Sequence, residues 1–139
     1  MKYLLDTCVI SELAKSNPEK NVIKWISDVP EESLYLSVFT IGEIRKGIEK
    51  LPESQRKDKL EEWITNDLLN RFENRIIDFT VEISQMWGKI QGQAELNGKI
   101  ISLIDGFIAS SAVSDEMVIV TRNVKDFKQS GVSLLNPWE

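Results

Sequence analysis

Short apolar runs alternate along the chain with segments whose apolar residues recur at helical spacing. The short runs lie at residues 3–5, 34–37, 76–77, 118–120 and 132–135, and the helical patterns lie at residues 22–29, 41–51, 60–72, 83–94 and 104–112. Strands that are apolar on both faces and separated by helices are typical of a parallel sheet covered by helices. The sequence therefore predicts an α/β fold, and its 139 residues without a linker predict one domain, residues 1–139.

Histidine is absent from the sequence, and cysteine occurs once, as Cys8. These two facts exclude Ser–His and Cys–His catalysis, a His–zinc site and an intramolecular disulfide. A metal ion would need oxygen ligands, which favours magnesium, manganese or calcium. The single cysteine, with no segment typical of a signal peptide or a membrane span, leads us to expect a cytoplasmic protein that does not bind membranes.

The net charge of −5 argues against a protein that coats nucleic acid, because such proteins are usually basic. It does not exclude a nuclease, since part of the negative charge can lie in one metal pocket and a bound divalent cation reverses the local field.

Acidic residues stand where the carboxyl ends of the predicted strands should lie. Asp6 follows the first strand, Glu43 lies in the first turn of the helix after the second strand, and Asp105 begins the helix before the fourth. Asn123 follows the fourth strand, with Asp126 three residues later. Ligands of parallel α/β sheets bind at this edge, so we expect these side chains to gather around one site.

Each acid also has a purely structural explanation. Thr40-x-x-Glu43 and Ser102-x-x-Asp105 match capping boxes, and Asp6 can cap a helix or a turn. Taken together, however, carboxylates within apolar stretches are costly unless a cation compensates their charge. A divalent ion is the natural counter-charge, because Mg²⁺ is bound by one or two carboxylates with waters and substrate phosphate oxygens.

Five segments at these residues resemble the PIN-domain family, and within it the VapC-type toxins of bacterial toxin–antitoxin pairs. They are LLDTCVISEL at 4–13, LSVFTIGEIRKGIEKL at 36–51, IIDFTVEISQMWGKI at 76–90, IDGFIASSAV at 104–113, and VTRNVKDF with GVSLLNPWE at 120–139. The resemblance implies a PIN-like three-layer sandwich with a roughly five-stranded parallel sheet. It also implies endoribonuclease activity dependent on Mg²⁺ or Mn²⁺, a homodimer, and a higher hetero-oligomer with an inhibitory cognate antitoxin.

The resemblance assigns metal binding to Asp6, Asp105 and Glu43, with Glu43 orienting the attacking water. The fourth catalytic position falls on Asn123, which is neutral where many relatives carry Asp, so a second metal would be weaker unless Asp126 compensates. Cys8 stands where the family commonly has Asn. We interpret Cys8 as a small packing residue rather than a nucleophile, because no base stands ready to ionise it.

Candidate substrate contacts lie beside the acids in the sequence. We interpret Arg45, Lys46 and Arg122 as phosphate contacts, and the hydroxyls of Thr7 and Thr121 as groups that hold a water or an acid. An alternative for the basic residues is a solvated helix face with ion pairs four residues apart.

Two further sets of residues have open interpretations. Trp63 and Trp87 can stack on bases, although their apolar helix faces favour core packing. The apolar stripe between residues 60 and 72 is either this helix's core face or a groove for a partner helix, and consists of Leu60, Ile64, Leu68 and Phe72, with Trp63 beside it.

Three other classes of protein compete with this interpretation. A phosphoacceptor receiver would need paired acids after the first strand, and a haloacid-dehalogenase-type phosphatase would need Asp-x-Asp there, where this chain has Asp6-Thr7-Cys8. A catalytically weak module that keeps the fold, and binds an antitoxin (and operator DNA through it) or RNA, remains open because Asn123 is neutral.

Overall fold

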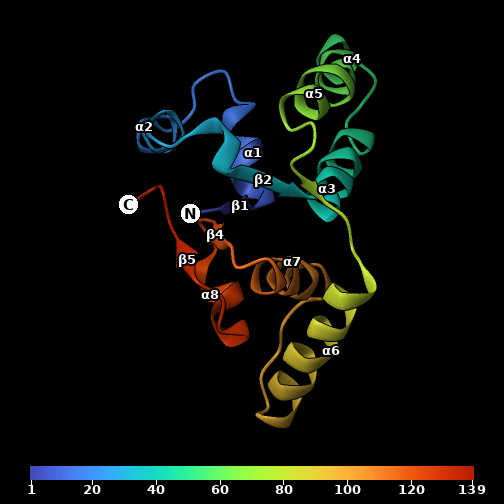
Figure 1. Ribbon diagram of the computed structural model, residues 1–139. Coiled ribbons are helices and arrows are strands. Elements are labelled where there is room, and N and C mark those ends of the chain that lie inside the picture. Colours follow the sequence, from blue (N-terminus) through green and yellow to red (C-terminus); the bar gives the residue numbers. More distant parts are fainter.

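Five parallel strands form one sheet in the computed structural model, which describes residues 1–139 (Figure 1). The strands are β1 (Tyr3–Leu5), β2 (Leu34–Ser37), β3 (Ile76–Ile77), β4 (Val118–Val120) and β5 (Leu134–Leu135), in the order β3-β2-β1-β4-β5. The structure thus confirms the predicted α/β class and the five-stranded parallel sheet. Strand β1 is central, so the residue that follows it lies between contributions from β2 and β4.

Helices cover both faces of the sheet. On one side lie α1 (Thr7–Leu13), α2 (Lys20–Asp28), α3 (Val38–Glu49), α4 (Gln55–Glu62) and α5 (Leu69–Arg71). On the other lie α6 (Val81–Leu96), α7 (Leu103–Ser114) and α8 (Val124–Phe127), and 3-10 turns occur at Glu31–Ser33 and Lys128–Ser130. Because successive strand residues point to opposite faces, Leu5 and Val120 join the first helical layer while Leu4 and Ile119 join the second.

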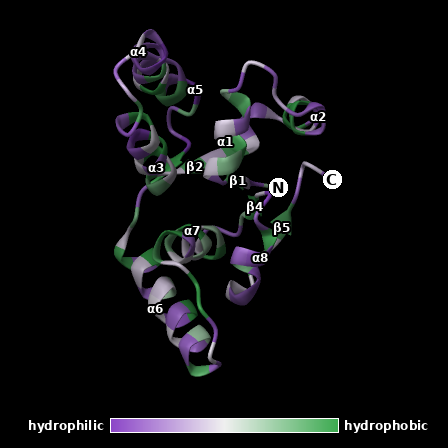
Figure 2. Ribbon diagram, turned by 180° about the vertical axis from the view of Figure 1, so that it is seen from behind, coloured by the Kyte–Doolittle hydropathy of each residue, from purple (hydrophilic) through white to green (hydrophobic).

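Hydropathy follows this layering (Figure 2). The strands consist almost entirely of hydrophobic residues, whereas α4 is largely hydrophilic. Helix α6 begins at Thr80, whose hydroxyl accepts a hydrogen bond of 3.2 Å from the Ile83 amide, and ends at Asn97 before Gly98 with φ of +68°. Helices α6 and α7 then form a hairpin that projects from the sheet, as Figure 1 shows.

Four elements differ from the sequence-based expectation. The predicted helix at residues 60–72 contains a π-helical stretch, Trp63–Leu68, between α4 and α5. Ile64, Leu68 and Phe72 recur every four residues, a spacing that drifts around an α-helix, and the wider turn keeps all three in the core. Helices α1 and α8 were not predicted because they are too short for a periodic pattern, and the strand expected at 132–135 is limited to β5.

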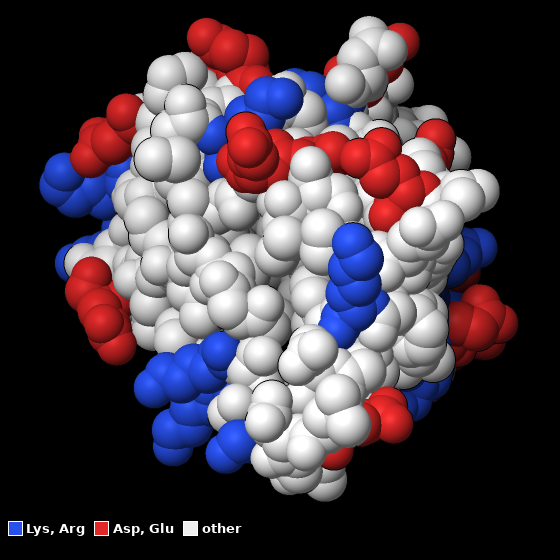
Figure 3. Space-filling model, turned by 60° about the horizontal axis from the view of Figure 1, so that its bottom comes forward, with Lys and Arg blue, Asp and Glu red and all other residues white.

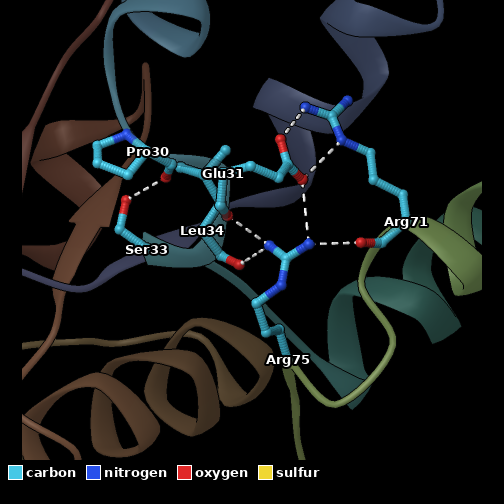
Figure 4. Close-up of polar contacts among 6 residues, drawn as sticks. All are labelled: Pro30, Glu31, Ser33, Leu34, Arg71 and Arg75. Carbon is cyan, nitrogen blue, oxygen red and sulfur yellow. Dashed lines mark hydrogen bonds and ion pairs between the residues drawn. The ribbon is translucent and has the colours of Figure 1, made fainter.

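A clamp of two arginines fixes the segment before β2 to the segment before β3 (Figure 4). Arg71 donates two hydrogen bonds of 3.0 and 3.1 Å to the Glu31 carboxylate, and Arg75 donates one of 3.1 Å to the same group. The Arg75 guanidinium also donates to the carbonyls of Glu31, Leu34 and Arg71. The clamp lies at the amino ends of these strands, so it stabilises the edge of the sheet opposite the clustered acids.

None of the helices combines the length and the hydrophobicity needed to cross a membrane.

Candidate active site

Asp6 occupies the carboxyl end of the central strand and is the N-cap of α1. Its side chain is 6% exposed, with Oδ1 accepting a hydrogen bond of 2.9 Å from the Thr7 amide and Oδ2 accepting one of 2.8 Å from Thr121 Oγ1. Burial raises the pKa of Asp6, the two hydrogen bonds oppose that rise, and the negative charge of Glu43 adds to it. Asp6 therefore does cap a helix, as its structural explanation expected. The same carboxylate is buried at the carboxyl edge of the sheet.

Glu43 approaches Asp6 from α3, through Thr7. The Thr7 hydroxyl donates a hydrogen bond of 2.6 Å to Glu43 Oε1 and so connects the first turn of α1 to α3. Helix α3 starts at Val38 after its N-cap Ser37, whose hydroxyl accepts from the Phe39 amide at 3.1 Å, so Glu43 lies in the second turn and not in the first turn as predicted. The alternative of a capping box between Thr40 and Glu43 is therefore wrong. Glu43 therefore faces the site instead of folding back on its own helix.

Asp105 lies in the first turn of α7, on the other side of the sheet. Ser102 is the N-cap of this helix, and its hydroxyl donates a hydrogen bond of 2.8 Å to Asp105 Oδ2. Burial raises the pKa of Asp105, and the negative charges of Asp6, Asp126 and Glu43 raise it further. The acids predicted from three separate segments thus lie within electrostatic reach of one another, and Asp126 is near enough to contribute.

The segment after β4 completes the surroundings of Asp6. Thr121 is fully buried, and its hydroxyl accepts a hydrogen bond of 2.9 Å from the Asn123 amide, which favours a role in holding Asp6 over a direct contact with substrate. Asn123 itself is exposed. The Cys8 sulfur accepts from the Arg122 amide at 3.4 Å, and burial raises the pKa of the thiol, which agrees with Cys8 as a packing residue.

The three acids Asp6, Glu43 and Asp105 have no arginine or lysine within ion-pair distance; the Lys and Arg side chains that do form ion pairs bind other carboxylates. As placed, they also do not form a closed group of three ligands around one point. Mg²⁺ needs only one or two carboxylates, with waters completing its octahedron. Buried or mutually repelling carboxylates without a basic partner fit such a cation, because it supplies the missing counter-charge.

The basic candidates lie outside this group. Arg45 and Lys46 are exposed on α3 and form no ion pair, and the ion pairs four residues apart that the alternative interpretation expected on this helix are absent. Surface charge is unevenly distributed: the face in Figure 3 shows acidic side chains in a band and basic ones in separate clusters, with uncharged surface between. The net charge of −5 therefore does not describe local patches.

A hollow of about 280 Å³ adjoins Glu43 between α1, α3 and α4. Its lining includes Thr7 and Glu43 together with six apolar side chains: Ala14, Ile44, Ile48, Leu51, Leu60 and Trp63. Lys15 and Arg56 also line the hollow, and the sequence analysis did not identify them. The signal for Lys15 was its spacing, because Thr7, Ser11 and Lys15 recur every four residues, as on one face of a helix.

The predicted apolar stripe is divided between the core and the hollow. Ile64, Leu68 and Phe72 belong to the core, so only Leu60 and Trp63 face the hollow. Trp87 packs against Phe107, which bears out core packing for that residue.

Comparison with known proteins gives consistent results over almost the whole chain. The sequence matches the PIN domain family over residues 3–131. It is 35% identical over 136 residues to the VapC ribonuclease Y4jK of Sinorhizobium fredii, covering 98% of this chain and 97% of that protein. It is 33% identical to the toxin FitB of Neisseria gonorrhoeae, with 97% of each chain covered.

The solved structures agree with the sequence comparison. The structure superposes with a TM-score of 0.93 on FitAcB from Neisseria gonorrhoeae, at 33% identity and with 99% of both chains covered. A structure of VapBC2 from Rickettsia felis bound to a promoter DNA fragment aligns with a TM-score of 0.81, at 26% identity and with 98% of both chains covered.

Proposed function

The chain belongs to the PIN-domain family, and from that membership we propose that it is a metal-dependent endoribonuclease, the toxin of a toxin–antitoxin pair. Its relatives are named as ribonucleases and toxins, and their structures are toxin–antitoxin complexes. The nuclease domain in this proposal spans residues 1–139, and the substrate is the phosphodiester backbone of RNA.

One observation carries the assignment of the site: Asp6, Glu43 and Asp105 converge at the carboxyl edge of the sheet without a basic partner. Burial and the neighbouring negative charges raise the pKa values of Asp6 and Asp105, as expected for carboxylates that await a cation. In this proposal Asp6 and Asp105 hold Mg²⁺ or Mn²⁺. When bound, such an ion places positive charge against the scissile phosphate and makes a nearby water more acidic.

The chain's own side chains supply orientation and proton transfer. Thr121 and the Thr7 amide hold the Asp6 carboxylate, while the Thr7 hydroxyl holds Oε1 of Glu43. Oε2 of Glu43 accepts no hydrogen bond within the protein and can accept one from the attacking water, which it orients and deprotonates. Attack by water, with departure of the 3′ oxygen, gives a 5′-phosphate and a 3′-hydroxyl. Thr7, Arg45, Lys46, Thr121 and Arg122 remain the proposed substrate-binding and supporting set, and Asn123 remains the fourth catalytic position.

We further propose that the antitoxin inhibits the enzyme at the hollow beside Glu43. The apolar lining from Ile44 to Trp63 suits a hydrophobic side chain of an antitoxin segment, and the adjoining acids suit a basic one. A basic side chain placed there would replace the charge of the cation. The proposed assembly is a homodimer that binds antitoxin in a larger hetero-oligomer. Binding of an antitoxin is supported by the relatives' structures, which include FitAB and VapBC2 bound to DNA fragments.

The test is cleavage of total cellular RNA by the purified, antitoxin-free chain with Mg²⁺ or Mn²⁺. Asp6→Asn and Asp105→Asn proteins and an EDTA sample serve as controls. We expect discrete fragments with 5′-phosphates in the metal samples and none in the controls. Fragments that persist in EDTA or in both variants would overturn the carboxylate–metal assignment.

Asn123 decides between this enzyme and a catalytically weak module. If the well-folded wild-type chain does not cleave RNA while Asn123→Asp does, the chain is the binding module and its nuclease site has been weakened at that position. We expect instead that the wild type cleaves, and that Asn123→Asp lowers the metal concentration needed for half-maximal rate.

A further inference from the structure

Arg122 is an exposed basic residue in the segment that follows β4. It directly follows Thr121, and its amide donates to Cys8 Sγ at 3.4 Å, so its backbone is anchored to the Asp6 surroundings. Its exposed guanidinium forms no ion pair and no hydrogen bond in the structure. The group instead lies over the Trp138 ring, with its central carbon 5.5 Å from the ring centroid.

Trp138 is itself held by a hydrogen bond within its own segment and by one from α2. Its amide donates a hydrogen bond of 2.9 Å to Asn136 Oδ1, and its carbonyl accepts one of 3.1 Å from Asn21 Nδ2 on α2. The side chain is partly buried against the core cluster that also includes Leu5 and Val120. The indole therefore offers Arg122 a fixed flat surface, which restricts a long side chain that would otherwise sample many rotamers.

Arg122 also lies where two surface hollows meet. One, of about 510 Å³, is lined by Arg122 with Lys15, Lys20 and Trp138, and the other, of about 490 Å³, by Arg122 with Lys125 and Lys128. Each hollow contains two acids as well, Glu12 and Glu19 in the first and Asp126 and Glu139 in the second. Glu12 accepts hydrogen bonds of 2.9 Å from Lys15 and from the Glu19 amide, which lower its pKa, and the positive charge of Arg122 adds to this effect without forming an ion pair. Arg122 is the basic residue common to both hollows.

We propose that Trp138 is a positioning residue that holds the Arg122 guanidinium to bind a phosphate of the RNA backbone next to the acid site. Contact with the indole leaves the guanidinium N–H groups without a hydrogen-bond partner in the protein, so they are available to a ligand. Two parallel N–H groups match two oxygens of one phosphodiester, an arrangement that lysine cannot reproduce. The segment after β5 thereby becomes part of the substrate site. This inference rests on the proposed function, because it names how the same site holds its substrate.

A double-mutant cycle tests the inference. Binding of a labelled, mixed-sequence single-stranded RNA is measured with Asp105→Asn protein, which is expected to bind RNA without cutting it. Trp138→Leu should weaken binding about threefold, and Arg122→Met by more. Arg122→Met should also reduce the salt slope of log K by about 0.7, as for one lost phosphate contact. In the Arg122→Met background, Trp138→Leu should cause no further loss.

Two variants keep the cycle interpretable. Trp138→Phe retains a flat ring, should lose less affinity than Trp138→Leu, and replaces it in the cycle if the leucine variant does not fold. Trp25→Leu is the matched control, since Trp25 packs edge-on against Tyr3 in the same core cluster and does not contact Arg122. It should leave RNA affinity unchanged.

The outcomes separate this inference from the proposed function. The positioning role is overturned if Trp138→Leu lowers RNA affinity equally with and without Arg122, or lowers it in neither background. It is also overturned if the protein does not bind RNA. Cleavage by the wild type is scored in parallel. Coupled loss of binding without any wild-type cleavage would support the Arg122–Trp138 pair and overturn the nuclease proposal.

Discussion

Thr121 Oγ1 donates a hydrogen bond of 2.8 Å to Asp6 Oδ2 and so joins the ends of two neighbouring strands that are 115 residues apart in the sequence. Both side chains are buried, and the Thr121 hydroxyl also accepts from the Asn123 amide. A single hydroxyl thus connects the central acid to the segment that carries Asn123 and Arg122.

Thr121→Val removes this hydroxyl and keeps the shape of the side chain. We expect a loss of about 1–3 kcal/mol in the free energy of unfolding, because the buried Asp6 carboxylate and the Asn123 amide each lose a partner. Urea denaturation measures the loss, and Thr121→Ser should retain most of the stability. A valine variant as stable as the wild type would show that water replaces the hydroxyl.

Asp105→Asn should stabilise the metal-free protein while abolishing cleavage. The substitution removes a half-buried charge that is repelled by Asp6, Asp126 and Glu43, and the Ser102 hydroxyl can still donate to the amide oxygen. We expect a gain of a few tenths to about 1 kcal/mol in EDTA, since partial exposure screens the repulsion. In saturating Mg²⁺ the wild type should be the more stable of the two proteins, because only the wild type is stabilised by binding the ion. Thermal unfolding in both buffers measures this, and a variant less stable than the wild type in EDTA would contradict it.

Gly106→Ala should destabilise the packing of α6 on α7. A Cβ at this position would lie 3.0 Å from Trp87 Nε1 and 3.2 Å from its Cδ1, so the indole must move. We expect a cost of about 1–3 kcal/mol and a lower cleavage rate, because Asp105 is the preceding residue. The matched control is Gly92→Ala on α6, where a Cβ meets nothing within 4 Å and higher helix propensity should add about 0.5–1 kcal/mol. Equal effects of the two substitutions would rule out the close contact as the cause.

Glu31→Gln should weaken the arginine clamp in a pH-dependent way. Hydrogen bonds from Arg71, and secondarily from Arg75, lower the pKa of Glu31 below its ordinary value of 4.5. A carboxylate with a lowered folded-state pKa contributes stability above its unfolded pKa and loses it as the pH falls through the folded value. We expect the variant to be less stable at pH 7 by about 1 kcal/mol or less, since the pair is half-exposed. The difference should shrink as the pH falls below the ordinary pKa and vanish below the lowered folded-state pKa. Denaturation at several pH values measures it, with Asp28→Asn as the control for a simple surface pair.

The acids of the site could be predicted from the sequence because each follows a recognisable strand or begins a periodic helix. Asp6, Glu43 and Asp105 needed only the rule that parallel strands present their carboxyl ends at one edge. The contact between Thr7 and Glu43 could not be predicted, because α1 is too short for a periodic pattern and Thr40 suggested a local cap instead. The stacking of Arg122 on Trp138 depends on the path of the chain after β5, on which hydrophobic periodicity carries no information.

The pairing of Asp6 with Thr121 also affects when the protein can become active during its own synthesis. Domains begin to fold from the N-terminus while the chain is still being translated. Strand β1 and Asp6 leave the ribosome before the segment after β4 that supplies Thr121, which lies 115 residues further along the chain. A growing chain that has not reached this segment therefore has Asp6 without its hydroxyl partner. For a protein that cuts RNA, this order of synthesis means that the acid site is completed only after the segment following β4 has been made.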